Sequence, residues 1–323
     1  MGQFLSNCSV DSLATAAQSL IDGHLVAFPT ETVYGLGADA TNQSAVARIY
    51  EVKGRPADHP LIVHIADLKY LDQWISEIPA YAIELARSFW PGPMTLILNR
   101  SELAKDFITG NQDTVGIRIP DNSLALGLLE AFHQKGGAGI AAPSANRFGQ
   151  VSPTTAAAVE EELSEYLTDS DLVLDGGPSE VGLESTIIDC TTELPRILRP
   201  GAITIAMIEE VTGLKISDTD ISNQTSIRVS GSLENHYAPK AKVILDQEPT
   251  AGTGLIALAE IQTPPGVVRL AAPNTVEEFA RTLYSALREG DHQNLETIYI
   301  SQPAGDGLAI AIRDRLARSA RGR

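Results

Sequence analysis

Scarce basic side chains and several hydroxyl groups stand in short polar segments that adjoin apolar runs. Lys53 and Arg55 follow a helical pattern, and Arg118 and Arg199 lie at or near the ends of apolar runs. The segment 29–37 adds hydroxyls, a carboxylate and flexible glycines directly after an apolar run. Cations and hydroxyls of this kind bind carboxylates and phosphates. No single segment identifies a function, so the set has to be weighed together.

Each of these residues also has a structural interpretation. His64, in an apolar run, is compatible with a core histidine whose hydrogen bonds are satisfied, and Arg118 with a structural salt bridge. Lys53 and Arg55 could end a helix, because a helix C-terminus favours cations. Residues 144–146 could form an ordinary turn with bonds from side chain to backbone. The residue types alone leave these alternatives open.

The common nucleotide and hydrolase signatures are missing. The chain has no G-x-x-x-x-G-K-[ST] segment, no HExxH, no GxSxG and no obvious Cys/His pair. Residues 35–40 match G-x-G-x-x-A by letter, but six residues separate them from the preceding strand pattern and the next helix starts only near Ser44. A dinucleotide fingerprint needs strand, tight turn and helix in immediate succession. We therefore reject it and interpret Tyr34, just before it, as a packing residue.

Composition favours a folded, acidic, two-domain protein. The chain has 323 residues, 43% of them hydrophobic, and 41 acidic against 24 basic side chains give a formal net charge of −17. That balance opposes a nucleic-acid binder that works by bulk electrostatics, although a local basic pocket stays compatible. Cys8 and Cys190 are far apart, which favours neither a disulfide framework nor a zinc site. We expect no signal peptide, no membrane contact and a cytoplasmic location.

Short apolar runs, which are typical of strands, alternate with longer helical patterns along the chain. This alternation predicts an α/β fold. Strands are predicted at 24–28, 61–65, 94–98, 114–119, 139–142, 172–174 and 185–189. Helices are predicted at 44–52, 80–89, 123–133, 153–167 and 203–211, the fourth capped by Ser152 with Pro153 in its first turn. The strand at 114–119 puts Thr114, Gly116 and Arg118 on one face and Val115 and Ile117 on the other.

The amino-acid composition changes near residue 215. Residues 216–227 are polar, so we expect a large domain at 1–213, a linker at 214–240 and a small α/β domain at 241–323. In the small domain, strands are predicted at 242–245, 254–258, 266–270 and 297–300, and helices at 276–288 and 307–318. The chain ends in the basic residues Arg313, Arg315, Arg318, Arg321 and Arg323, which fit a solvated helix end or a contact with nucleic acid.

Eight segments in order carry a family resemblance: PTETVYGLGADA, KGRP, HPLIVHI, WPGPMTLIL, TVGIRIP, APSAN, GLESTIID and ILRPG. Together they resemble the YrdC-like domain of threonylcarbamoyl-AMP synthases, over residues 20 to about 211. The linker SGSLENHYAP and the small domain resemble the long, two-domain branch of that family. The resemblance implies a twisted mixed sheet with flanking helices and a deep cleft, followed by a smaller Rossmann-like domain.

The resemblance also implies a reaction: L-threonine, bicarbonate and ATP give threonylcarbamoyl-adenylate and pyrophosphate, with Mg²⁺ accompanying ATP. Such chemistry needs no protein nucleophile, because holding two anions together and neutralising phosphate charge suffices. By resemblance Lys53 and Arg55 are the catalytic residues. The expected threonine-binding residues are Thr32, His64, Arg118, Ala142 and Ser185. The expected ATP-binding residues are Arg55, His59, Thr114, Ser144, Asn146, Ser152, Arg199 and either His236 or Tyr237, which would close over the nucleotide. No protein-built metal site is expected.

Two alternatives remain at this point. A related hydrogenase-maturation enzyme makes carbamoyl-adenylate from carbamoyl phosphate, but such proteins carry cysteine pairs that this chain lacks. The second alternative is a non-catalytic RNA-binding module. The negative net charge of the chain argues against it, because RNA is itself negatively charged. The expected partners are ATP, threonine and bicarbonate, then the tRNA threonylcarbamoyl transferase complex downstream, with a weak tRNA contact left open.

Overall fold

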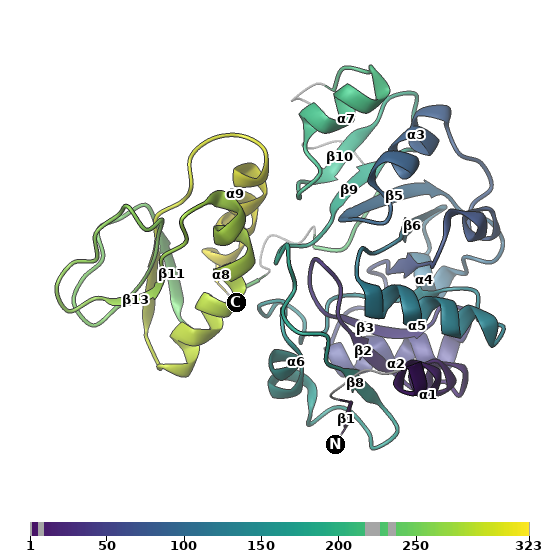
Figure 1. The fold of residues 1–323 in the computed structure, drawn as a ribbon, viewed down its shortest axis with the longest axis horizontal. Helices are drawn as coiled ribbons and strands as arrows, with labels where there is room; N and C mark the ends of the chain where they lie inside the picture. The colour runs from purple at the N-terminus through teal and green to yellow at the C-terminus, as the bar shows by residue number, and fades with distance from the viewer. Residues whose placement is uncertain (1, 6–9, 217–226, 232–236, 323) are drawn as a thin grey trace.

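The computed structural model describes residues 2–5, 10–216, 227–231 and 237–322. Within them, the larger domain is built on a ten-stranded mixed sheet (Figure 1). Its strands are β1 (Gln3–Leu5), β2 (Val26–Phe28), β3 (Gly35–Asp39), β4 (Ile62–His64), β5 (Met94–Asn99), β6 (Thr114–Arg118), β7 (Ile140–Ala141), β8 (Leu172–Leu174), β9 (Thr186–Asp189) and β10 (Arg196–Arg199). They lie in the order β1-β8-β2-β3-β7-β4-β6-β5-β9-β10. The predicted α/β class and mixed sheet are confirmed.

Helices cover both faces of this sheet. They are α1 (Val10–Ile21), α2 (Gln43–Lys53), α3 (Ala80–Phe89), α4 (Asp106–Thr109), α5 (Ser123–Gln134), α6 (Ala156–Leu163) and α7 (Ile205–Thr212), with a 3₁₀ helix at Leu68–Gln73. Helices α1 and α5 pack with Val26 and Phe28 of β2 in one apolar cluster. Ala27, between them, faces the other cluster, which contains residues of α2 and α3. The alternation of strand side chains thus assigns successive residues to opposite faces.

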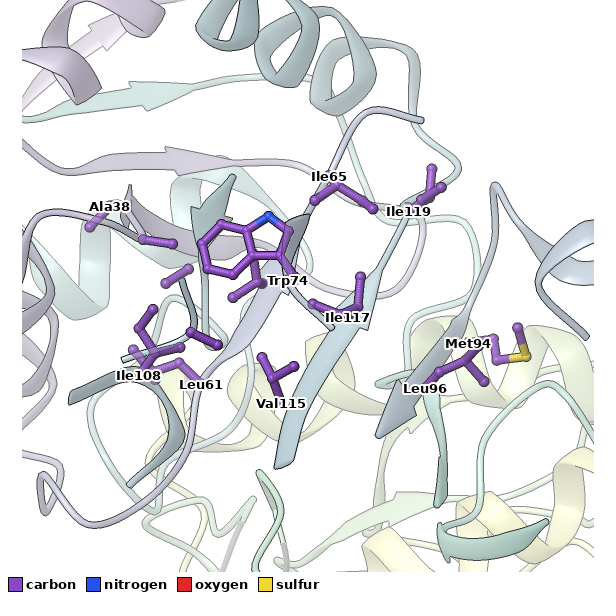
Figure 2. Packing of buried hydrophobic residues seen from close by; sticks show 14 of the residues in the cluster. Ala38, Leu61, Ile65, Trp74, Met94, Leu96, Ile108, Val115, Ile117 and Ile119 are labelled. Atoms are coloured by element: carbon purple, nitrogen blue, oxygen red, sulfur yellow. The ribbon is translucent and has the colours of Figure 1, made fainter. Parts of the chain in front are cut away.

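The second cluster shows the same alternation in β6 (Figure 2). Val115 and Ile117 are buried beside Trp74, as the periodicity predicts, while Arg118 turns to the opposite side, where it lines a pocket. Apolar burial of this kind contributes roughly 25 cal/mol per Å² to stability. A register slip of one residue would move Arg118 into the core, so the core fixes the position of this cation.

Two capping motifs fix the ends of α2. Asn42 accepts hydrogen bonds from the backbone N–H groups of Ser44 and Ala45 at the N-terminus. Gly54 ends the helix in the left-handed conformation, with φ of 61°, and its N–H donates to the carbonyl of Glu51. Lys53 and Arg55 flank this glycine, so the end of the helix sets the direction in which both cations leave it.

The smaller domain contains a parallel four-stranded sheet in the order β11-β14-β12-β13. Its strands are β11 (Lys242–Leu245), β12 (Gly254–Ile256), β13 (Val268–Ala271) and β14 (Thr297–Ile300), and its helices are α8 (Val276–His292) and α9 (Leu308–Ser319). Figure 1 shows both helices on the side of this sheet that faces the larger domain. Among the described residues, no helix combines the length and apolar character needed to cross a membrane.

Some local predictions were wrong. The helix predicted at 153–167 spans only Ala156–Leu163, because the hydroxyl of Thr155, not of Ser152, accepts the capping hydrogen bond from Ala158 N–H. Ser152 instead donates to the Glu184 carboxylate, at 2.7 Å. No strand was predicted at the position of β3. Its glycines have low strand propensity, but β2 and β7 pair with it on both sides.

Candidate active site

One polar pocket collects side chains from loops and strand ends across the larger domain, and Tyr237 of the linker is among its lining residues. In the register of the parallel pair β4 and β6, His64 and Arg118 are partners, so both lie at the same edge of the sheet. The lining residues are Thr30, Thr32, Val33, Tyr34, Gly35, Lys53, Arg55, Ile62, His64, Arg118, Ala142, Pro143, Ser144, Phe148, Glu184, Ser185, Arg199, Ser230, Gly231 and Tyr237.

One part of the pocket has the groups that an amino acid needs. Arg118 Nη2 lies 2.7 Å from Glu31 Oε1, and both side chains are buried. Thr32 Oγ1 lies 2.9 Å from Thr30 Oγ1, which itself donates to the carbonyl of Val33. Since a hydroxyl has one proton, Thr32 is the donor in that pair and its own oxygen can still accept. A guanidinium beside a free acceptor suits a carboxylate and an ammonium on neighbouring atoms.

His64 stands next to Arg118 as a neutral imidazole. Burial, and then the charge of Arg118, lower the pKa of His64 to about 3, so the ring is uncharged at neutral pH. Its Nδ1 is buried, and no hydrogen-bond partner for it is found in the described part of the chain. A neutral imidazole offers one donor and one acceptor. The ring can therefore orient a hydroxyl or an amine without adding charge.

Two further basic side chains, Lys53 and Arg55, line the same pocket. Lys53 Nζ donates to the carbonyls of Ser144 and Asn146, which uses two of its three donors. Burial lowers its pKa well below the usual range, and the charge of Arg55 adds to this effect. Burial also lowers the pKa of Arg55, to about 10, so Arg55 stays charged at neutral pH. Its Nη2 donates to the Pro60 carbonyl at 2.8 Å and to Ser230 Oγ at 3.2 Å.

Arg199 connects the two parts. Its guanidinium donates to the Ser185 carbonyl from Nε and Nη2, at 3.1 and 2.9 Å, and to Ser185 Oγ at 3.1 Å. Nη1 donates to the Ser230 carbonyl at 2.9 Å. Burial lowers the pKa of Arg199 from its usual value. Four basic side chains thus surround the pocket in a chain whose net charge is −17. Such a concentration of basic side chains favours an anionic ligand.

Most of the predicted site residues meet in this pocket, and some do not line it. Thr32, Lys53, Arg55, His64, Arg118, Ala142, Ser144, Ser185, Arg199 and Tyr237 line it. Asn146 and Ser152 lie one contact away, through Lys53 and Glu184. The His59 ring packs against that of lining residue Phe148, with centroids 5.5 Å apart. Thr114 lies at the start of β6, the end opposite Arg118. His236 is outside the described residues.

Sequence reasoning missed three polar contributors. Glu31 was noticed only as a carboxylate in its segment, and Glu184 stood unassigned in the GLEST segment. Tyr34 was interpreted as packing, but it lines the pocket and donates from its hydroxyl to the Gly177 carbonyl, at 2.7 Å. A charged residue inside an otherwise apolar or hydroxyl-rich segment is the signal that could have marked the two carboxylates.

Comparisons with known proteins agree with this site. A family model described as telomere recombination (Sua5, YciO and YrdC) matches residues 18–201, and one described as the C-terminal domain of threonylcarbamoyl-AMP synthase matches 203–321. Threonylcarbamoyl-AMP synthase of Pyrococcus abyssi is 40% identical, covering 94% of this chain and 92% of the relative. The Bacillus subtilis enzyme of that name is 38% identical, covering 96% and 93%. The chain belongs to the threonylcarbamoyl-AMP synthase family.

A solved structure of a relative is similar to this chain over both domains. The crystal structure of Sua5 from P. abyssi complexed with L-threonine matches with a TM-score of 0.87 and 38% identity. The match covers 99% of this chain and 97% of that one. The predicted family and two-part α/β architecture are therefore confirmed.

Proposed function

We propose that this protein makes threonylcarbamoyl-adenylate from L-threonine, bicarbonate and ATP and releases pyrophosphate. The observation that carries the proposal is the meeting of an amino-acid pocket around Arg118 and His64 with the cations Lys53, Arg55 and Arg199. The names of the curated relatives and the threonine complex of the P. abyssi relative support it. The product is an activated intermediate for threonylcarbamoyladenosine formation in tRNA.

Arg118 binds the threonine carboxylate in this proposal, because a guanidinium can give a carboxylate two parallel hydrogen bonds. Thr32, His64 and Ser185 bind the hydroxyl and amine groups, and Ala142 contributes backbone. Once the ammonium has lost a proton, the amine and bicarbonate give a carbamate and water. A carbamate oxygen then attacks the α-phosphorus of ATP, and pyrophosphate leaves with the bonding electrons. The residues accelerate this step by holding both anions in position.

Lys53, Arg55 and Arg199 neutralise the triphosphate and the charge that develops on the leaving pyrophosphate. His59, Thr114, Ser144, Asn146 and Ser152 complete the proposed ATP site. Tyr237, with His236 beside it in sequence, closes over the nucleotide. Exclusion of water by such a closure would protect a labile acyl-phosphate product.

Mg²⁺ would enter with ATP. Among the described residues, no group of three or more His, Cys, Asp or Glu side chains is arranged to hold a metal ion. Phosphate oxygens and water would therefore be its main ligands. Asn146 Oδ1, a buried oxygen with no hydrogen-bond partner within the described ranges, is of the kind that Mg²⁺ accepts. The ion would supply charge neutralisation on the phosphates.

The chain would act in the cytoplasm, upstream of the tRNA threonylcarbamoyl transferase complex. Three arginines near the chain end, Arg313, Arg315 and Arg318, are engaged within the protein, so they do not favour a direct tRNA contact. Arg313 donates to the carbonyls of Pro303 and Gly305, and Arg318 pairs with Asp314. Arg315 is buried. This supports the structural interpretation of that segment.

Pyrophosphate release tests the proposal. The protein is supplied with ATP and Mg²⁺, and threonine and bicarbonate are each included or omitted. Release that requires both substrates is expected. Release with carbamoyl phosphate in place of threonine and bicarbonate would instead identify the carbamoyl-adenylate reaction. No release, together with salt-dependent RNA binding, would favour the RNA-binding alternative.

A further inference from the structure

Arg315 of α9 is a fully buried cation, and most of its contacts lie in the other domain. Its Nε donates to Glu184 Oε2 at 2.8 Å, and its Nη2 donates to the carbonyl of Pro200 at 3.0 Å. Among the described residues of the small domain, its ion-pair partner is Asp314, its neighbour in sequence, at 2.6 Å. A buried cation is costly unless its partners are well placed. The position of Arg315 is therefore fixed by groups of the larger domain.

Glu184 depends on the small domain in return. Its carboxylate accepts from Tyr284 Oη of α8 at 2.9 Å as well as from Arg315, while Ser152 donates to it from the larger domain at 2.7 Å. Burial by itself raises the pKa of Glu184, but the charges of Arg315 and Arg199 and two hydrogen bonds outweigh it and hold the pKa at about 2. The carboxylate is thus charged, buried and neutralised mainly from the small domain.

Both anchor points of Arg315 adjoin residues of the proposed active site. Glu184 directly precedes Ser185, and Pro200 directly follows Arg199. Arg199 in turn donates to the carbonyl and hydroxyl of Ser185. One side chain of the small domain therefore holds two segments whose neighbouring residues bond to each other inside the pocket.

The same cluster holds Tyr237, which lines the pocket from the linker. Its ring stacks on that of Tyr284, with centroids 5.7 Å apart, and the Arg315 guanidinium lies 5.5 Å from the ring centroid. Ser319 Oγ donates to the Tyr237 carbonyl at 3.0 Å. Tyr237 has a φ of 63°, a conformation that large side chains rarely adopt without support. Contacts from α8 and α9 supply that support.

We propose that Arg315, assisted by Tyr284, is a positioning residue of the small domain: it holds Ser185, Arg199 and Tyr237 in the arrangement that binds threonine and ATP. This inference rests on the proposed function. Arg315 lines no part of the pocket and acts only through Glu184, Pro200 and the Tyr237 ring. The small domain thereby completes the site.

The test compares Arg315→Met with the double variant Glu184→Gln/Arg315→Met and the control His292→Ala. His292 also crosses the domain interface, at 2.8 Å from Glu161, but both side chains are half exposed and lie outside the pocket lining. The double variant removes both charges, so Glu184 does not stay buried as a carboxylate without the Arg315 cation. The KM values for threonine and ATP and the kcat are measured in full-length protein.

We expect Arg315→Met to raise both KM values about tenfold or more, the scale of a lost charged hydrogen bond. The double variant should be more thermally stable than Arg315→Met, but its KM values should stay raised, because the Arg315 guanidinium is still missing. Arg315→Lys should recover only part of the effect, since one ammonium cannot reproduce the guanidinium fork. Wild-type KM values in Arg315→Met, or an equal change in His292→Ala, would overturn the inference.

Hydrogen exchange separates this inference from the proposed function, because it needs no substrate. Exchange at residues 184–186 and 237–238 should rise about tenfold in Arg315→Met and stay unchanged in His292→Ala. If Arg315→Met does not fold, Tyr284→Phe removes one hydrogen bond to Glu184 and keeps the stacked ring. It should raise exchange at residues 184–186 by a smaller factor, and unchanged exchange there would contradict the inference. If the wild-type protein releases no pyrophosphate, the proposed function is contradicted instead.

Discussion

Glu31 and Arg118 form a buried ion pair in which Oε1 and Nη2 are 2.7 Å apart. A guanidinium has five N–H donors, so this pair leaves several of them for a ligand. Glu31 compensates the buried charge before substrate binds, and it restricts the directions in which the remaining donors can point. A threonine carboxylate would then meet a cation that is already oriented.

Replacing Arg118 should separate threonine binding from ATP binding. Arg118→Ala is expected to raise the KM for threonine strongly, by about 2–3 kcal/mol of lost binding, and to leave ATP affinity nearly unchanged. Steady-state kinetics with each substrate varied in turn measures both. Because the single variant leaves Glu31 buried without its cation, Glu31→Gln/Arg118→Ala serves as the matched control for stability. An unchanged threonine requirement in both variants would remove Arg118 from the threonine site.

Lys53 should take up a proton when ATP binds. Burial lowers the pKa of its ammonium well below the usual range in the free protein. Triphosphate charge nearby favours the ammonium and raises the pKa again. Binding should therefore absorb protons in the pH range between the lowered pKa of the free protein and the raised pKa of the ATP complex, and the uptake should disappear below and above that range. Calorimetry of ATP binding in buffers of different ionisation enthalpy measures this uptake. Lys53→Arg, always charged, should not show it, and equal uptake in both proteins would contradict the assignment.

The domain interface should weaken in acid. The pKa of Glu184 is about 2 in the folded protein, against a usual value of 4.5. Because the folded pKa is the lower one, the stabilisation is fully present above the usual pKa and is lost as the pH falls toward the folded value. The loss amounts to about 3 kcal/mol. Urea unfolding across this range measures it. Glu184→Gln should show a smaller fall than the wild type, and an identical pH dependence would refute the contribution.

Gly231 should be essential for the approach of the linker to the pocket. It has a φ of 81°, and a Cβ there would lie 2.5 Å from Tyr237 Oη and 3.1 Å from Arg199 Nη1. Gly231→Ala is expected to lower kcat as well as stability. Gly213→Ala is the matched control, because Gly213 has a φ of 68° and nothing lies within 4 Å of the added atom. The control should lose only about 1 kcal/mol of stability, from backbone strain. Equal kcat values in the two variants would argue against close packing at Gly231.

The sequence predicts the structure well where the local periodicity of apolar residues alone decides which side chains are buried. Val115 and Ile117 had to face the core once β6 was recognised, and Arg118 then had to face away. Strand β3 was missed because its glycines carry no strand preference, and its two neighbouring strands decide its conformation. The Ser152 cap was wrong because Glu184, 32 residues away, competes for its hydroxyl. Arg315 and Glu184 are 131 residues apart in the sequence. A pattern of neighbouring residues therefore cannot predict this ion pair.

The carbon of bicarbonate offers the sharpest test of the proposed reaction. The protein is incubated with ¹³C-bicarbonate, threonine, ATP and Mg²⁺, and the adenylate product is analysed by mass spectrometry beside a reaction with unlabelled bicarbonate. We predict a threonylcarbamoyl-adenylate whose mass rises by one ¹³C label, together with pyrophosphate in equal amount. A protein that binds threonine and ATP but gives no labelled adenylate, or that releases ADP and phosphate instead, would contradict the assigned reaction.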